Sequence, residues 1–380
     1  GDQVAAGLHV ERAEGGVPAG ANVTITARVD GEEVFRGQAV VDAQGNCPAR
    51  FDLPAQIRRG VGLLSMAIED GGVVETASKT IPILLQTVDL SLYPEGGELV
   101  AGLKTRVYFE AFTPAGKPAD LAGVVVDQRG LEVGRFSSEH EGRGRFSIKP
   151  RAGGQYALRI TEPSGIQTEF PLPEVQSTGA VVAPQRDVFP ADGPIQLRVA
   201  ATHPAVTVTL SKRERVISNQ RLQLAGEPAQ LRLRPPAGVD GVLVATVWDE
   251  AGKPLAERLI FRRPAKAVRV TIEPDRERYM PGGAASITVT ATDEDGDPAE
   301  AVVGLVVTDD SVLEMIDQRE QAPRLPVMVL LEDEVRELAD AHVYLDPADP
   351  IAPTAVDLLL GTQGWRRFAL VHLQEFLAEH

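Results

Sequence analysis

Residues that could carry out nucleophilic chemistry are few and scattered along this sequence. It has one cysteine, Cys47, and six histidines, and it contains neither a Gly-x-Ser-x-Gly nor a His-Glu-x-x-His segment. A nucleophile of a hydrolase needs a base and an orienting acid beside it. The sequence therefore predicts a protein that is not an enzyme and that uses no cofactor.

Three aspartates at alternate positions, Asp293, Asp295 and Asp297, could attract Ca²⁺, which takes six to eight oxygen ligands. The glycine, Gly296, is the fourth residue of this stretch rather than the sixth, and no glutamate stands at the twelfth position. The alternative is a solvated hairpin turn whose charges keep a sheet edge from pairing with other chains. The pattern favours the turn, so we predict no metal site and keep the three aspartates as the candidate.

Cys47 is flanked by Asn46 and Pro48, and no lysine, histidine or helix start lies beside it to lower its pKa. This environment favours a small packed side chain over a reactive thiol. A single cysteine also excludes an internal disulfide, which fits a cytosolic protein or a bacterial envelope protein equally well.

The polar segment 317–326 contains two prolines and offers Arg319 and Arg324 to a trypsin-like protease. It could be a bait loop, a segment that a protease is induced to cut. The alternative is an ordinary connector between two helices, and its short length favours that alternative.

Trp365, Arg366 and Arg367 could form an exposed docking epitope, because tryptophan and arginine dominate the energetic centres of protein interfaces. The alternative is that Trp365 packs in the core beside Leu358 and Phe368 while the arginine stems cover the surface. The helical spacing of these apolar residues favours packing.

The net charge of −16 opposes binding to phosphate backbones and to anionic lipid surfaces, both of which need a field of lysine and arginine. No run of 18 or more apolar residues is present. We therefore expect protein partners, no nucleic acid and no membrane insertion by this segment.

The elements that must position these residues follow a long repeat. Pro18, Pro94, Pro190 and Pro281 each follow an apolar residue and precede a glycine within three residues, at spacings of 76, 96 and 91 residues. This period suits a small β-sandwich of about 100 residues. We expect four such modules, each with its own core, at 1–87, 88–175, 176–265 and 266–380.

Alternating apolar residues and turn signals predict strands in every module. They are expected at 22–29, 34–41, 106–112, 123–127, 142–148, 154–160, 195–200, 205–211, 230–233, 241–249, 267–274, 285–292 and 302–309. After Ser311 the apolar period becomes helical, which predicts helices within 312–318, 330–338 and 354–379 attached to the fourth module. The fold class is all-β, with tandem immunoglobulin- or fibronectin-like sandwiches and a C-terminal helical segment.

Three stretches together resemble the macroglobulin-domain proteins of the alpha-2-macroglobulin superfamily in their bacterial form. They are residues 90–103, residues 279–282 with 306–313, and residues 355–368. Modules two and four and the tail carry the resemblance, whereas modules one and three share only length and strand rhythm.

This resemblance implies fibronectin-like macroglobulin sandwiches, a place outside the cytoplasm (periplasm, cell surface or secreted), and a bait loop at 317–326. The family's Cys-Gly-Glu-Gln thioester is not matched, because Cys47 has no glutamine in register, so the chain resembles a fragment without the thioester domain. The expected function is a non-enzymatic structural or recognition fragment related to endopeptidase inhibition, with proteases or other envelope proteins as partners. The alternative is a surface spacer or adhesive array linked to an outer-membrane system.

Overall fold

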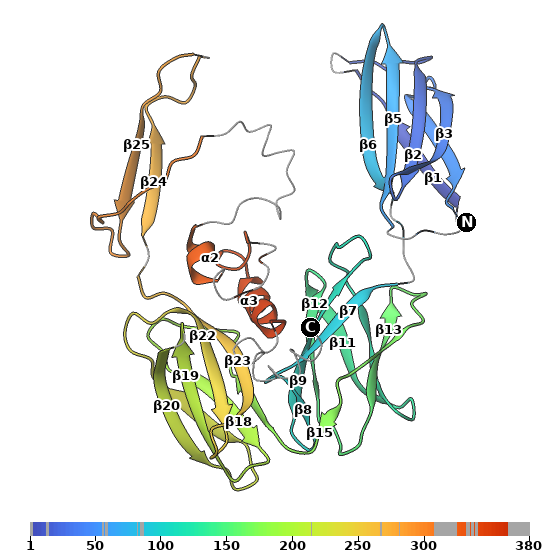
Figure 1. The fold of residues 1–380 in the computed structure, drawn as a ribbon. Coiled ribbons are helices and arrows are strands. Elements are labelled where there is room, and N and C mark those ends of the chain that lie inside the picture. Colours follow the sequence, from blue (N-terminus) through green and yellow to red (C-terminus); the bar gives the residue numbers. More distant parts are fainter. Residues whose placement is uncertain are drawn as a thin grey trace, which may run out of the picture. The chain divides into compact units, whose positions relative to one another are not determined.

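The computed structural model describes residues 3–12, 15–54, 57, 60–81, 83, 87–213, 215–266, 268–280, 282–307, 325–331, 335, 338 and 341–363, and strands dominate them (Figure 1). The chain is all-β, as predicted. Contacts divide it into unit 1, residues 1–91, 109–144 and 156–172, and unit 2, residues 92–108, 145–155 and 173–380. The division runs across the strands of the second module.

The first module is a sandwich of a four-stranded sheet, ordered β3-β2-β5-β6, and a two-stranded sheet of β1 and β4. Alternate residues of β2 are buried, and they meet Phe51, Met66 and Cys47 in one apolar core. The predicted strand at 22–29 is confirmed. The strands are β1 (Gln3–His9), β2 (Asn22–Val29), β3 (Glu32–Val40), β4 (Asn46–Asp52), β5 (Gly62–Asp70) and β6 (Val73–Ile81).

The second module contains a seven-stranded sheet ordered β14-β13-β10-β11-β12-β9-β7, and a parallel pair of β15 and β8. Tyr156 and Leu158 both point inward and are buried, as the sequence predicted. The strands are β7 (Asp89–Pro94), β8 (Leu99–Val100), β9 (Thr105–Phe112), β10 (Ala122–Asp127), β11 (Glu132–His140), β12 (Arg143–Ile148), β13 (Tyr156–Glu162), β14 (Glu169–Pro171) and β15 (Val175–Gln176).

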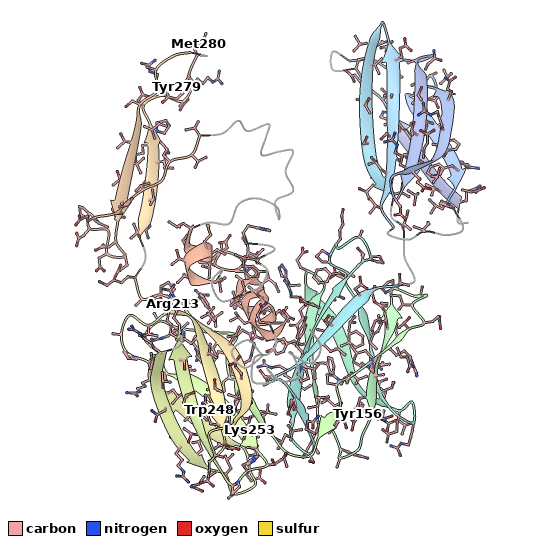
Figure 2. The ribbon with its side chains drawn as sticks, in the orientation of Figure 1. Tyr156, Arg213, Trp248, Lys253, Tyr279 and Met280 are labelled. Carbon is pink, nitrogen blue, oxygen red and sulfur yellow. The ribbon has the colours of Figure 1, made fainter. Side chains whose placement is uncertain are left out.

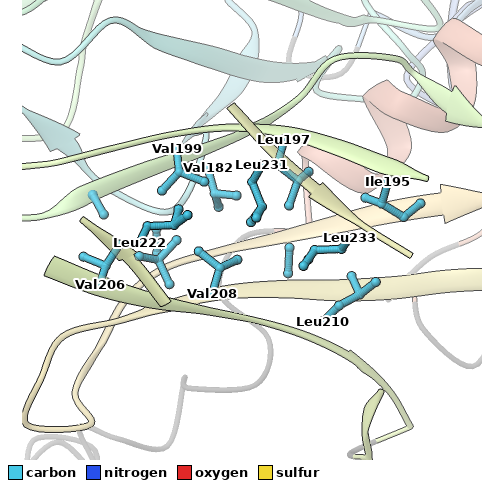
Figure 3. Packing of buried hydrophobic residues seen from close by; sticks show 14 of the residues in the cluster. Val182, Ile195, Leu197, Val199, Val206, Val208, Leu210, Leu222, Leu231 and Leu233 are labelled. Atoms are coloured by element: carbon cyan, nitrogen blue, oxygen red, sulfur yellow. The ribbon is translucent and has the colours of Figure 1, made fainter. Parts of the chain in front are cut away.

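The third module is a closed sandwich of a five-stranded sheet, ordered β17-β23-β22-β19-β20, and a three-stranded sheet, β16-β18-β21. Leucine, isoleucine and valine side chains from both sheets fill the space between them (Figure 3). The strands are β16 (Ala180–Pro184), β17 (Val188–Phe189), β18 (Ile195–Ala201), β19 (Ala205–Lys212), β20 (Arg215–Gln223), β21 (Ala229–Leu233), β22 (Gly241–Trp248) and β23 (Pro254–Arg262).

A second apolar cluster covers the other face of β22 and β23. Val242, Leu259 and Phe261 contact side chains of the helical segment, which includes α2 (Leu325–Leu330) and α3 (Ala352–Gly361). The sequence pattern assigned these helices to the fourth module, but they pack on the third, because strands buried on both faces need a second apolar layer.

The described strands of the fourth module, β24 (Arg269–Pro274) and β25 (Ile287–Thr292), form a two-stranded hairpin. Apolar residues lie on one face and mostly threonines on the other, yet most of these side chains are exposed. The loop between the strands carries the exposed Tyr279 and Met280 (Figure 2).

The prediction of a strand at 302–309 is wrong for the described residues 302–307, because they form no strand and pair with no neighbouring strand. An edge without a packed second layer gains too little to hold a strand.

Candidate functional site

Cys47 lies in β4 and is fully buried among the core residues of the first module. Burial raises the pKa of its thiol, and the charge of Asp42 acts in the same direction. A thiol with a raised pKa and no exposed surface is a poor nucleophile. The structure therefore agrees with a packing role for this residue.

The three aspartates of the fourth module form a hairpin turn. Asp293 Oδ1 accepts the backbone N–H groups of Asp295 at 3.0 Å and of Asp297 at 2.9 Å. Gly296 is the fourth residue of the turn and has φ +88°, the left-handed conformation that glycine adopts without strain. One carboxylate is thus occupied by the turn itself.

The same turn recurs in the other modules, where the sequence Asp-x-x-Gly-x begins at Asp42, Asp127 and Asp249. In each copy the first aspartate accepts N–H groups two and four residues later. A variant with threonine first begins at Thr113. In Figure 2, Trp248 and Lys253 mark the ends of the third-module copy. Among the described residues no group of three or more His, Cys, Asp or Glu side chains could hold a metal ion.

The remaining candidates, Arg319 and Arg324 of the bait segment and Trp365, Arg366 and Arg367 of the docking epitope, lie outside the described residues. Only Leu325 and Pro326 of the bait segment are described, and they belong to α2 rather than to the predicted loop.

A different set of residues forms the most specific arrangement in the chain, a buried network of charged side chains within unit 2. Its centre is Asp357 of α3, which is 2% exposed. Arg258 of β23 donates from Nη2 to Asp357 Oδ1 at 2.6 Å and to the Asp357 carbonyl at 3.3 Å. Arg145 of β12 donates from Nη1 to Asp357 Oδ2 at 2.5 Å. A strand of each of modules two and three is therefore joined to one helical carboxylate.

Tyr108 of β9 links the two sides of this centre. Its hydroxyl donates to Asp357 Oδ2 at 2.8 Å and accepts from Arg258 Nη2 at 2.9 Å. The Arg258 guanidinium also lies over the Tyr108 ring, with its central carbon 4.7 Å from the ring centroid. Such a cation on an aromatic face is stabilising, and more so when water is excluded.

Two further ion pairs complete the network. Arg106 of β9 grips both oxygens of Glu95, at 2.6 Å and 3.3 Å. Arg145 grips both oxygens of Asp187, at 2.7 Å and 3.0 Å. Glu95 Oε1 also lies 3.6 Å from Arg258 Nε. Three guanidinium groups thus face three carboxylates, so the formal charges of the network cancel.

Burial and charge act against each other at the carboxylates. Burial raises the pKa of Glu95 despite the charges of Arg106 and Arg258. At Asp357 burial acts the same way, but the surrounding arginines and the Tyr108 hydroxyl outweigh it and hold the pKa of the carboxyl below its ordinary 3.8. Burial also raises the pKa of the Tyr108 hydroxyl well above its ordinary value, so Tyr108 stays a hydrogen-bond donor. Asp357 is accordingly the ionised centre of the network.

Close backbone approach allows the elements to meet. Gly361, the last residue of α3, lies so close to the Tyr108 ring that an added Cβ would fall 2.3 Å from Tyr108 Cδ1. On the other side, the N–H of Glu257 in β23 donates to the carbonyl of Gly96 at 3.1 Å. The arrangement can hold strands and a helix in one relative position. The network therefore has the properties of a rigid joint between these elements.

Sequence reasoning did not find this network, because its members are spread from residue 95 to residue 357 and match no motif. One local signal exists, since Asp357 stands alone among Val356, Leu358 and Leu359 in an apolar helix. A charged residue within an apolar stretch is buried only when a partner compensates it. The sequence contains no information on which arginines those partners are.

Comparisons with known proteins bear on the fold. No protein-family model matches the sequence, and no curated protein matches it significantly. Among solved structures, the native conformation of Escherichia coli alpha-2-macroglobulin has a TM-score of 0.26 and 13% identity over 77% of this chain and 24% of that one. Dimeric latent PorU from Porphyromonas gingivalis has a TM-score of 0.31 and 13% identity over 69% of this chain and 31% of that one.

The Escherichia coli adhesin FdeC is similar over 69% of this chain and 92% of its own, with a TM-score of 0.29 and 12% identity. The chain spans less than a third of the alpha-2-macroglobulin and of PorU. The likeness is confined to the β-domain fold. Within the described residues, no helix is long and apolar enough to cross a membrane.

Proposed function

We propose that this chain is a non-enzymatic structural and recognition segment of a bacterial envelope protein of the macroglobulin-like kind, located outside the cytoplasm. The observation that carries the proposal is the buried network around Asp357. It fastens strands of the second and third modules to helix α3 with cancelling charges. In this role the network is a stiff joint that holds these strands and the helix in one relative position.

A buried ion network is suited to such a joint. Removing charges from water costs several kcal/mol per ion, and only near-ideal geometry recovers that cost. A small displacement of α3 would leave a guanidinium or a carboxylate buried without its partner. The network therefore favours one relative position over neighbouring ones more sharply than apolar contacts do, because apolar contacts tolerate sliding.

Protease inhibition is the finer part of the proposal. The resemblance to the macroglobulin modules assigns the bait role to residues 317–326, and Arg319 and Arg324 are residues that trypsin-like enzymes cut after. Helix α2 begins at Leu325 and packs Val327 into the cluster on the third module. In this interpretation, a cut within residues 317–326 alters the packing of α2 and so affects the joint, and the partners are proteases.

The alternative function, a surface spacer or adhesive array, is favoured by a specific feature of the connections. At the boundary between the predicted second and third modules, β15 pairs in parallel with β8. At the next boundary, the N–H of Arg263 donates to the carbonyl of Phe189 at 2.9 Å. Connections that are themselves hydrogen-bonded are stiffer than free linkers, and a spacer needs such stiffness.

Limited proteolysis separates these functions. The full chain is treated with trypsin at low enzyme ratio, and the earliest fragments are identified by mass spectrometry. An inhibitor segment is cut first after Arg319 or Arg324, and an Arg319→Gln/Arg324→Gln variant loses that cut. Arg278→Gln, in the exposed loop between β24 and β25, is the matched control and should leave it unchanged. First cuts at other sites, or uniform resistance, would reject the bait and leave the spacer.

A further inference from the structure

The outer face of the three-stranded sheet in the third module is basic, although the chain as a whole carries a net charge of −16. Strands β16, β18 and β21 contain no aspartate or glutamate. Their register places Arg198 opposite Gln230 and Gln196 opposite Arg232, so both arginines lie on the same face. This face does not belong to the core, which takes Ile195, Leu197 and their neighbours.

An open groove of about 550 Å³ lies at the edge of this face, within unit 2. Lys104, Arg106 and Arg198 line it together with the polar side chains of Ser147, Gln185 and Gln230. Glu95 is its one acidic lining residue, and both of its oxygens are held by Arg106. The lining therefore carries a surplus of positive charge.

The cations of this face are not neutralised locally. In the part of the chain that the structure describes, no carboxylate forms an ion pair with Lys104, Arg198 or Arg232. Arg198 is nevertheless held in place, because its Nη2 donates to the carbonyl of Lys104 at 2.8 Å. One contact leaves most of its N–H groups available to a ligand.

We propose that this groove binds an extended acidic peptide segment of a partner protein. In an extended chain the side chains at alternate positions point the same way and lie about 7 Å apart. The register makes Arg198 and Arg232 diagonal neighbours on adjacent strands, and such neighbours lie about 7–8 Å apart. Lys104 lies beside Arg198, whose guanidinium contacts the Lys104 carbonyl. Alternate carboxylates of an extended peptide suit these cations, and guanidinium groups bind carboxylates in a two-pronged manner. Gln185 and Gln230 line the same groove, where the Gln185 amide donates to the Gln230 amide oxygen, and their remaining amide N–H groups and oxygen can pair with a peptide backbone. The site adds a partner class to the proposed recognition role, on which it rests in part.

The test is fluorescence anisotropy with a labelled peptide in which glutamate alternates with serine, titrated with the full chain at low salt. Saturable binding is expected, and it should weaken as salt is added because the contacts are charge-driven. Arg198→Glu and Lys104→Glu should each weaken binding roughly tenfold or more. Matched reversals on the first module, Arg50→Glu and Lys79→Glu, should leave it unchanged.

Three outcomes would overturn the proposal: no saturable binding, equal binding to the groove variants, or displacement of the peptide by inorganic phosphate at the peptide's own concentration. The last would mean a site for small anions rather than for a peptide. Tryptophan fluorescence checks that the variants fold, and Arg198→Gln with Arg232→Gln replaces any that do not. A failed peptide titration leaves the proteolysis result untouched, so a failure of the peptide site can be distinguished from a failure of the bait segment.

Discussion

Two ion pairs of nearly equal length lie in very different surroundings. Arg258 and Asp357 approach to 2.6 Å with side chains 3% and 2% exposed, whereas Arg12 and Asp70 approach to 2.7 Å with side chains 41% and 38% exposed. Distance alone would rank them together. Burial, rather than distance, therefore decides how much each pair contributes to stability.

The physical reason is how well each charge is solvated once its partner has been removed. An exposed arginine that loses its carboxylate is solvated by water, and salt already screens the pair. A buried carboxylate that loses its arginine has no water to replace it. The buried pair is therefore a device that enforces one arrangement, while the exposed pair follows the arrangement that the module already has.

The chain supplies a separate probe for each pair. Trp248 lies in β22 within unit 2, so its fluorescence reports on the unit with the buried pair. The single thiol, Cys47, is fully buried in the core of the first module, so its labelling in urea reports on the module with the exposed pair.

The largest effect is expected from Arg258→Met. Methionine fills a similar volume, but it removes the positive charge of Arg258, which faces both Asp357 and Glu95 in the wild type. The free energy of unfolding of unit 2 should fall by about 3–5 kcal/mol. The measurement is urea denaturation followed by tryptophan fluorescence. A loss no greater than that of an exposed pair would show that water enters the network, and would contradict the claim that burial makes this pair important for stability.

Asp357→Asn should have a smaller effect that depends on pH. The pKa of Asp357 is lowered in the folded state, so its ionised form stabilises the fold above the ordinary 3.8, and this contribution is lost as pH falls through the folded value. The stability difference between the wild type and the variant should therefore be greatest at neutral pH and shrink in acid. A difference that stays constant down to acid pH would mean that folding does not shift the pKa of Asp357, contrary to the assigned direction.

Glu95→Gln sharpens the same experiment, because the pKa of Glu95 is raised. Its contribution is present below the ordinary value of 4.5 and is lost as pH rises through the folded value. The glutamine variant should therefore gain stability relative to the wild type as pH increases. Opposite pH trends of the two variants are expected from one network, and equal trends would contradict the assigned directions.

Gly361→Ala should weaken the joint without touching a charge. The added Cβ would lie 2.3 Å from Tyr108 Cδ1, so either the ring or the end of α3 must move. Overpacking of this kind costs about 1–3 kcal/mol, part of which the better helix propensity of alanine offsets. Tryptophan fluorescence in urea measures it. Gly304→Ala, where no atom lies within 4 Å, is the control and should change nothing.

The strands of the closed modules were predictable because alternation is a local signal. The predicted strand 22–29 coincides with β2, and the predicted 205–211 differs from β19 by one residue. The strand predicted at 302–309 is wrong over the described residues 302–307 for a non-local reason: these residues are apolar apart from Gly304, but no partner strand is described beside them. Helix α3 was expected from its period, yet its place on the third module depends on apolar residues of β22 and β23 that the period does not reveal.

The candidate site was predictable only in part. The turn at Asp293 follows from the spacing of an aspartate and a glycine, and four related turns repeat it. Asp357 could be suspected from its apolar neighbours. Its pairing with Arg258 and Arg145 could not, because those arginines are 99 and 212 residues away and look like any other charged residue on an alternating strand. Only the packed fold brings them together.

The smallest effect is expected from Arg12→Met, which removes the exposed partner of Asp70. The pKa of Asp70 is lowered, chiefly by its hydrogen bond from Arg12, so Asp70 is ionised and pairs with Arg12 at neutral pH. Water nevertheless solvates both groups, and the urea midpoint of Cys47 labelling should hardly move. Repeating the titration at high salt should remove whatever difference remains, because screening acts on exposed charges. Arg12→Met could instead destabilise its module as strongly as Arg258→Met destabilises unit 2. In that case side-chain exposure would not predict how much an ion pair contributes to stability. The buried network would then hold its elements together no more strongly than an exposed pair does.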